Sequence, residues 1–153
     1  MTRYVAGFLF ADLRTRVLLV RKARPNWQKG KLNGIGGHIE PGETPEQAMS
    51  REFAEETGIR IDYWRCFATL IGKTDDKPWE VFWYVSAVAQ SADYKLISQP
   101  DEPVGWYPLN TYRETMPPVM PNLHWLIPMA KGRIEALENV KHFTIHEGYY
   151  STE

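Results

Sequence analysis

One stretch of this chain, residues 36–59, constrains its fold more than any other, and it reads GGHIEPGETPEQAMSREFAEETGI. Thr44 is a residue type that caps helix N-termini, and Gln47 three residues later completes a capping box. The proline that follows Thr44 suits the first helical position, where its missing N–H costs nothing. Gly58 suits the left-handed residue that ends a helix. The pattern therefore predicts a helix over residues 45–57.

Three glutamates of this helix, Glu52, Glu55 and Glu56, are spaced i, i+3 and i+4 and therefore share one face. Like charges at such spacing repel by about 0.2–0.5 kcal/mol per pair on an open helix. A solvated acidic surface is one explanation. A hard divalent cation such as Mg²⁺ is the other, because it prefers carboxylate, carbonyl and water oxygens. Glu43 and Arg51 are placed to form an ion pair that ties the preceding loop to the helix.

The same stretch resembles the signature of the Nudix hydrolase family. That signature reads Gly, five residues, Glu, seven residues, Arg-Glu, an apolar residue, any residue, Glu-Glu, any residue, Gly and an apolar residue. This sequence matches it at Gly37, Glu43, Arg51, Glu52, Phe53, Glu55, Glu56, Gly58 and Ile59. The resemblance implies an α/β fold, a Nudix-like α/β/α sandwich with a mixed β-sheet, in a single domain over residues 1–153. It also implies an enzyme that hydrolyses a phosphoanhydride bond in a nucleoside diphosphate derivative.

The resemblance also implies roles for individual residues. Arg51 and Glu43 would orient the loop and the helix in the catalytic site. Either Glu52 or Glu55 would take a proton from the attacking water, and the sequence favours neither. The implied ligands of Mg²⁺ or Mn²⁺ are the carbonyl of Gly36 and the carboxylates of Glu52, Glu55 and Glu56. Glu102, in a later acidic loop, is a further candidate ligand, with a solvated loop carboxylate as the alternative.

Four residues are candidates for substrate binding. Lys22 comes shortly after the apolar run VLLV, a position at which related enzymes often place a basic residue that binds phosphate. The alternative is a lysine that faces solvent. The stretches around Asn33 and Asn122 resemble the purine nucleoside triphosphatases of the family, in which they would bind the base. Their ordinary alternatives are a turn residue for Asn33 and a helix cap for Asn122. Trp27 is a candidate for stacking on the base or for a lid.

The leading functional hypothesis is hydrolysis of a (deoxy)nucleoside triphosphate to monophosphate and pyrophosphate. One alternative is hydrolysis of ADP-ribose or a nucleotide sugar. Another is a nucleotide-binding Nudix module without catalysis, which an intact set of signature glutamates argues against.

The net charge and the cysteine content indicate which kinds of partner and which cellular compartment to expect. The net charge of −1 over 153 residues does not suggest a nucleic-acid partner or a membrane surface. Cys66 is the only cysteine, so no intramolecular disulfide forms, and a reducing cytoplasm is expected. A nucleotide is the expected partner, and monomer and homodimer both remain open.

Apolar runs and breaker residues outline the other elements. Strands are expected over residues 4–10, 17–20, 60–70, 79–88, 105–109 and 142–146. Loops or turns are expected over residues 12–16, 24–37, 72–78, 89–105 and 115–121. A second helix is expected over residues 122–139.

Overall fold

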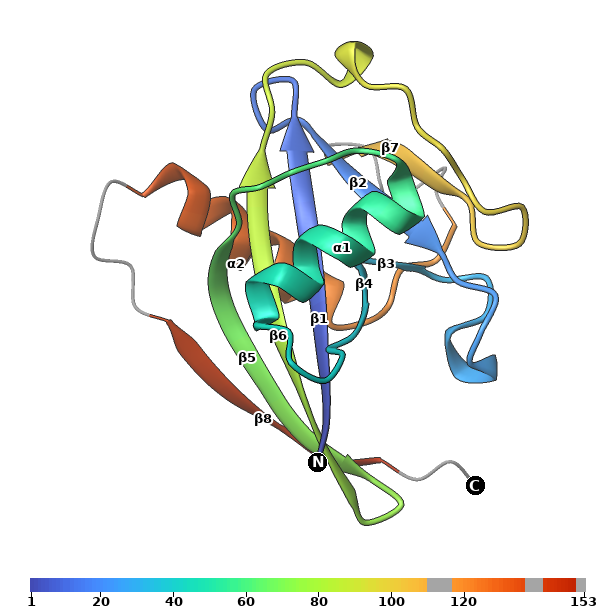
Figure 1. Ribbon diagram of the computed structural model, residues 1–153, viewed down its shortest axis with the longest axis vertical. Helices are drawn as coiled ribbons and strands as arrows, with labels where there is room; N and C mark the ends of the chain where they lie inside the picture. The colour runs from blue at the N-terminus through green and yellow to red at the C-terminus, as the bar shows by residue number, and fades with distance from the viewer. Residues whose placement is uncertain (110–116, 137–141, 151–153) are drawn as a thin grey trace.

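The computed structural model describes residues 1–109, 117–136 and 142–150 (Figure 1). None of the helices in these ranges is long and apolar enough to cross a membrane. The strands are β1 (Thr2–Ala11), β2 (Arg16–Arg21), β3 (Leu32–Asn33), β4 (Ile35–His38), β5 (Arg65–Thr74), β6 (Lys77–Ala87), β7 (Val104–Pro108) and β8 (Phe143–Tyr150). The helices are α1 (Pro45–Thr57) and α2 (Leu123–Glu135), with 3₁₀ turns η1 (Asn26–Gln28) and η2 (Ser91–Asp93).

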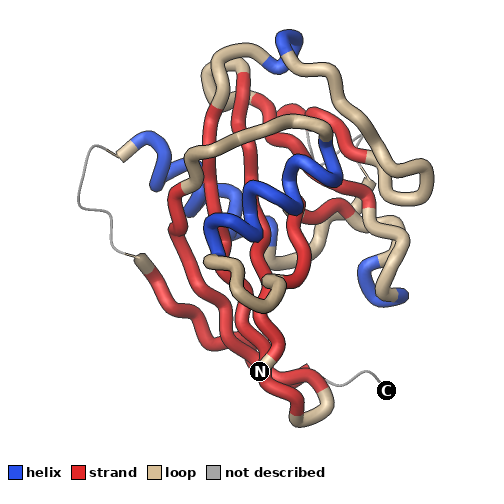
Figure 2. Tube along the Cα trace, viewed as in Figure 1, coloured by secondary structure: helices blue, strands red, loops and turns tan. Residues whose placement is uncertain are grey.

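The strands form one mixed sheet with the order β3-β2-β1-β6-β5-β8, to which β4 adds against β1 and β7 against β2. β1 pairs with β6 and β5 with β8 in parallel, while the remaining pairs are antiparallel. Helix α1 crosses one face of the sheet and α2 lies behind the other (Figures 1 and 2). This arrangement confirms the expected α/β/α sandwich with a mixed sheet.

Both faces of the central strands are buried, which explains why β1 and β2 are continuous apolar runs. In β1, Phe8 and Phe10 pack in the cluster that contains residues of α2. Val5 and Leu9 alternate with them and pack in the cluster that contains Met49 and other residues of α1. The sheet therefore separates two cores, and the acidic helix rests on only one of them.

Helix α1 begins and ends as its sequence predicts. The Thr44 side chain accepts a hydrogen bond from the Gln47 N–H, and the Gln47 side chain accepts one from the Thr44 N–H. Gly58 has a φ of 75°, the left-handed conformation that ends a helix. The capping box and the terminal glycine together fix where α1 begins and ends.

Several other expected boundaries are wrong. The expected loop over residues 24–37 contains strands β3 and β4, because β2 and β1 offer them backbone partners. β5 begins at Arg65 rather than at residue 60, and the expected turn over residues 72–78 shrinks to two residues because the β5–β6 ladder continues to Thr74 and Lys77. The last strand runs on to Tyr150. Residues 115, 116 and 137–139 of the expected loop and second helix lie outside the described residues.

Candidate active site

Arg51 connects the loop before α1 to the acidic face of the helix. Its Nε and Nη2 donate to the two carboxylate oxygens of Glu43 at 2.7 and 2.8 Å, a bidentate pair. Nη2 also donates to the His38 carbonyl at 3.0 Å, and Nη1 donates to Glu52 at 2.9 Å. The Arg51 guanidinium holds the pKa of Glu43 below its usual range, chiefly through the hydrogen bond. The predicted ion pair is therefore present, and its role in catalysis stays a prediction.

Glu52 lies against the glycine-rich end of β4. A Cβ added to Gly37 would lie 2.5 Å from the carboxyl carbon of Glu52, so any larger residue there would displace this carboxylate. Gly36 packs still more closely on the backbone of Val5, so a Cβ there would overlap the Val5 carbonyl oxygen. The two glycines thus let the end of β4 approach β1 at Gly36 and α1 at Gly37.

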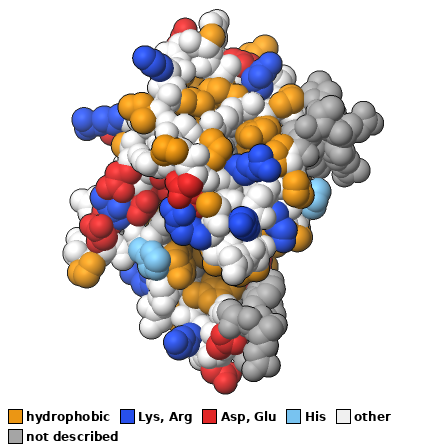
Figure 3. Space-filling view, turned by 90° about the vertical axis from the view of Figure 1, so that its right-hand side faces the viewer, with side chains coloured by type: hydrophobic (Ala, Val, Ile, Leu, Met, Phe, Trp, Pro, Cys, Tyr) orange, Lys and Arg blue, Asp and Glu red, His pale blue; other side chains and the backbone are white. Residues whose placement is uncertain are grey.

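Glu56 faces the other end of the site, towards β2 and the loop before β7. Burial raises its pKa to about 7, Lys22 opposes that rise, and Glu52, Glu102 and Glu55 add to it. Four carboxylates and one ammonium therefore share this region. Figure 3 shows acidic and basic side chains gathered together on one side of the molecule.

Lys22 and Glu102 contact each other, which the sequence did not predict. The Lys22 Nζ lies 3.1 Å from Glu102 Oε2, and the Ala23 backbone N–H donates to the same oxygen at 2.9 Å. Burial alone would raise the pKa of Glu102, but these two hydrogen bonds bring the pKa below its usual range. The substrate-phosphate role of Lys22 and the ligand role of Glu102 both stay predictions.

The predicted ligands fit a hard divalent cation by their chemistry, since they are carboxylates and one glycine carbonyl. The carboxylates of the described residues are not, however, gathered in any group of three that is ready to hold a metal. The Glu52 carboxylate forms an ion pair with Arg51, and the Glu102 carboxylate forms one with Lys22. The Glu55 side chain is 60% exposed. The expected convergence of Glu52, Glu55 and Glu56 therefore holds for the helix face but not for the carboxylate groups themselves.

Asn33 is held by its neighbours at the end of β3. Its Oδ1 accepts from the Gly34 N–H at 2.8 Å, and its Nδ2 donates to Gln28 Oε1 at 3.0 Å. The first contact is to the adjacent residue, and Asn33 lies in β3 rather than in a turn, so the alternative of a turn residue is wrong. The second involves Gln28, a residue the sequence did not single out, because only the fold of η1 brings it to β3.

Asn122 precedes α2, but its side chain makes no cap hydrogen bond, and its backbone is helical rather than extended. Its Oδ1 is buried with no hydrogen-bond partner among the described residues. The alternative reading of Asn122 as a side-chain helix cap is therefore wrong.

This geometry makes a prediction for stability. Asn122→Ala should change the free energy of unfolding by less than about 0.5 kcal/mol, since no cap bond is lost. Thr44→Ala is the matched control, because Thr44 caps α1 and its loss should cost about 1 kcal/mol. Urea unfolding of both variants measures the difference, and equal losses would contradict the assignment.

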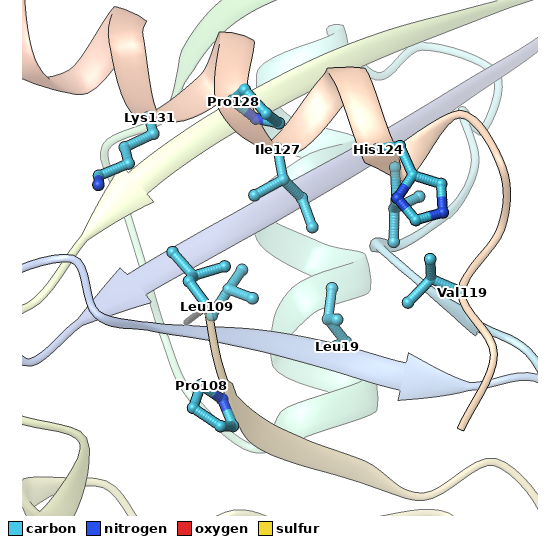
Figure 4. Close-up of a pocket in the computed structure, with 10 residues that line it drawn as sticks. Leu19, Pro108, Leu109, Val119, His124, Ile127, Pro128 and Lys131 are labelled. Carbon is cyan, nitrogen blue, oxygen red and sulfur yellow. The ribbon is translucent and has the colours of Figure 1, made fainter. Parts of the chain in front are cut away.

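Two further features lie apart from the carboxylates. Trp27, in η1, is 58% exposed, so its stacking role stays a prediction. An apolar pocket of about 290 Å³ lies between α2 and the β2 and β7 strands, where Leu19, Val119 and Ile127 point into it (Figure 4). Neither α1 nor any carboxylate lines this pocket, so it does not belong to the candidate active site.

Comparison with known proteins agrees with this arrangement. A family model described as the NUDIX domain matches residues 1–127. An oxidized purine nucleoside triphosphate hydrolase of Danio rerio is 51% identical over 47 residues, 31% of this chain and 30% of that protein. An 8-oxo-dGTP diphosphatase of Escherichia coli is 34% identical over 82 residues, 53% of this chain and 64% of that protein. The chain thus matches about a third and just under two thirds of these curated relatives.

Two solved structures share the fold. The mutator protein MutT of Bacillus halodurans has a TM-score of 0.70 at 19% identity, covering 99% of this chain and 92% of that one. The NUDIX domain of Shewanella oneidensis NrtR, solved with ADP ribose, has a TM-score of 0.70 at 23% identity, covering 86% of this chain and 87% of that one. At these identities the likeness extends to the fold alone.

Proposed function

The chain belongs to the NUDIX family, and on this premise we propose that it hydrolyses a phosphoanhydride bond in a nucleoside diphosphate derivative with the help of a divalent metal. The observation that carries the proposal is the acidic face of α1. Glu52, on that face, lies against Gly37, and Glu56 lies close enough to Lys22 and Glu102 for their charges to act on it. This combination of carboxylates, a glycine-rich strand end and a cation suits a metal–phosphate substrate.

Mg²⁺ or Mn²⁺ would be held by the Gly36 carbonyl with Glu52, Glu55 and Glu56, and Glu102 is the additional candidate. When bound, such an ion offsets phosphate charge and makes water more acidic. Glu55 is the better placed of the two candidate bases to accept the water's proton. Its carboxylate is 60% exposed and makes only a long 3.4 Å contact with Arg51, whereas Glu52 is 15% exposed and bonded to Arg51 at 2.9 Å.

Lys22 would bind the substrate's phosphates, and Arg51 with Glu43 would hold the catalytic helix in place. Lys22 already neutralises Glu102 at 3.1 Å, so a phosphate entering here would compete with that carboxylate for the ammonium. Arg51 makes its bonds to protein groups, to both oxygens of Glu43 and to the His38 carbonyl, which suits a positioning role.

A (deoxy)nucleoside triphosphate is the substrate we favour, with Asn33 and Asn122 binding its base. The names of the two curated relatives, both hydrolases of oxidised purine nucleotides, support this choice. ADP-ribose is the second candidate, favoured by the ADP ribose complex of a protein with the same fold. Nucleotide sugars belong with it, since they carry the same diphosphate linkage.

The products test the substrate and the bond together. If the base is fixed at Asn33 and Asn122 while the carboxylate face of α1 receives the phosphates, water should attack an inner phosphorus. A triphosphate should then give monophosphate and pyrophosphate, which phosphorus NMR with Mg²⁺ resolves. Orthophosphate as the first product would contradict this orientation. Cleavage of ADP-ribose but of no triphosphate would make ADP-ribose, the second candidate, the substrate. If no nucleotide is hydrolysed in the presence of metal, the protein is a nucleotide-binding module without catalysis.

A further inference from the structure

The end of β2 and the residues that follow it hold the acidic loop before β7 (Figure 1). The Arg21 N–H donates to the Pro103 carbonyl at 2.9 Å. The Ala23 N–H donates to Glu102 Oε2 at 2.9 Å, and Lys22 Nζ lies 3.1 Å from the same oxygen. The loop that carries Glu102 is therefore fixed to the end of β2 by backbone groups as well as by a side chain.

Arg24 adds a contact to each acid of this loop. Its Nη1 donates to Asp101 Oδ2 at 2.7 Å, and its Nη2 lies 3.9 Å from Glu102 Oε1. The side chains of Arg24 and Asp101 are 65% and 55% exposed, whereas that of Glu102 is 17% exposed. Exposed ion pairs add little to folding stability, so the main consequence of this pair is the position in which it holds the loop.

The two carboxylate oxygens of Glu102 have different surroundings. Oε2 is occupied by the Ala23 N–H and by Lys22, whereas Oε1 accepts no hydrogen bond from the residues that the structure describes. The charge of Glu102 acts on Glu56, so the carboxylate lies on the side of the proposed metal site. Groups that fix one atom of a ligand orient the other towards a metal. Oε1 is therefore the oxygen that Glu102 can offer to a cation.

We propose that Arg24 is a positioning residue for the metal site. Paired with Asp101, it holds the acidic loop so that Glu102 presents Oε1 to the cation. This inference rests on the proposed function, in which Glu102 is the additional candidate ligand. The rival role for Arg24 is direct binding of the substrate's phosphates. The two roles differ in what they require of Asp101, because removing Asp101 would disturb the loop but would release the guanidinium for a phosphate.

The test measures Mn²⁺ binding to the protein by electron paramagnetic resonance with no nucleotide present. Arg24→Ala should raise the Kd for Mn²⁺ about tenfold, the low end of the effect of losing a group that orients a metal ligand. Removing a positive charge would by itself favour a cation, so a weaker affinity identifies the lost position of the ligand. Asp101→Ala should raise the Kd by a similar factor, because it breaks the same pair. Melting temperatures in EDTA should stay within about 3 °C of the parent value, since the pair is exposed.

Two comparisons connect this effect to Glu102. Arg24→Ala should raise the Kd no further when it is added to Glu102→Gln, because Arg24 then has no ligand to position. Arg24→Lys should recover part of the affinity, since an ammonium can still pair with Asp101. Arg14→Ala is the matched control. It breaks another exposed pair, with Glu135, and should leave the Kd within about twofold of the parent value.

An unchanged or lower Kd in Arg24→Ala would overturn the inference, and so would a loss of affinity that persists in full beside Glu102→Gln. A higher KM for the nucleotide at an unchanged Kd for Mn²⁺, with Asp101→Ala no worse than the parent, would assign Arg24 to the substrate's phosphates instead. A parent protein that binds no Mn²⁺ would overturn the inference, while hydrolysis of the nucleotide panel still decides the proposed function. If the parent binds Mn²⁺ but hydrolyses no nucleotide, the proposed function fails, and the Mn²⁺ titrations still decide the role of Arg24.

Discussion

Glu56→Gln should lower kcat/KM with Mg²⁺ by about 100-fold or more while the fold survives. Glu56 lies where Lys22, Glu52, Glu55 and Glu102 all act on its charge, so it is central to the proposed metal site. An amide keeps the size of the side chain but removes its negative charge, and a hard cation binds an amide less tightly than a carboxylate. Steady-state hydrolysis of the preferred nucleotide measures the effect, with circular dichroism to verify the fold.

The same variant should be more stable than the parent when no metal is present. Burial raises the pKa of Glu56 from 4.5 to about 7, so the folded state favours the protonated acid. The stability that the folded protein gains from protonated Glu56 is fully present below pH 4.5 and is lost as the pH rises to about 7. The ionised side chain then costs on the order of 3 kcal/mol, which glutamine avoids.

Urea unfolding in EDTA at pH 8 and at pH 4.5 should therefore show a gain for Glu56→Gln only at the higher pH. Glu55→Gln is the control, because Glu55 is exposed and its ionised form is already hydrated. A folded Glu56→Gln enzyme with normal turnover would remove the metal-site assignment. An equal gain at both pH values would instead show that the unfavourable charge lies elsewhere.

Local signals made α1 predictable and left β3 and β4 hidden. The capping box, the proline at the start of the helix and Gly58 all act within a few residues, so the bounds of α1 can be predicted from the local sequence. Residues 32–38 are rich in glycine and carry no strand pattern. They become strands only because β2 and β1 pair with them, and the local sequence does not show which strands will pair.

The contacts of the candidate site likewise include one that the sequence predicts and one that it does not. Glu43 and Arg51 lie eight residues apart in a predicted loop and helix, so their ion pair followed from spacing. Lys22 and Glu102 are eighty residues apart, and their contact depends on the loop before β7 lying against the end of β2.

Arg51→Ala should lower both the stability and the activity of the protein. Arg51 donates two bonds to Glu43, one to Glu52 and one to the His38 carbonyl. The side chains of Glu43 and Glu52 are 17% and 15% exposed, so removing their counter-charge leaves two poorly hydrated carboxylates close together. The expected loss is about 2–3 kcal/mol, between the values for exposed and fully buried pairs. Turnover should fall more than about tenfold, because Glu52 is no longer held beside Gly37.

Arg60→Ala is the matched control for this loss. It also removes an arginine near α1, but the Arg60 and Asp62 side chains are 84% and 74% exposed, so the change should stay below about 0.5 kcal/mol. Arg51→Lys should restore only part of the stability, since an ammonium cannot reproduce the two-pronged bond to Glu43. Melting temperatures and turnover measured on all three variants distinguish two roles for Arg51. Parallel losses fit a residue that positions the helix and Glu52. Lost turnover at an unchanged melting temperature would mean that the guanidinium acts on the substrate directly, because the bonds to Glu43 and His38 would then contribute nothing to the fold.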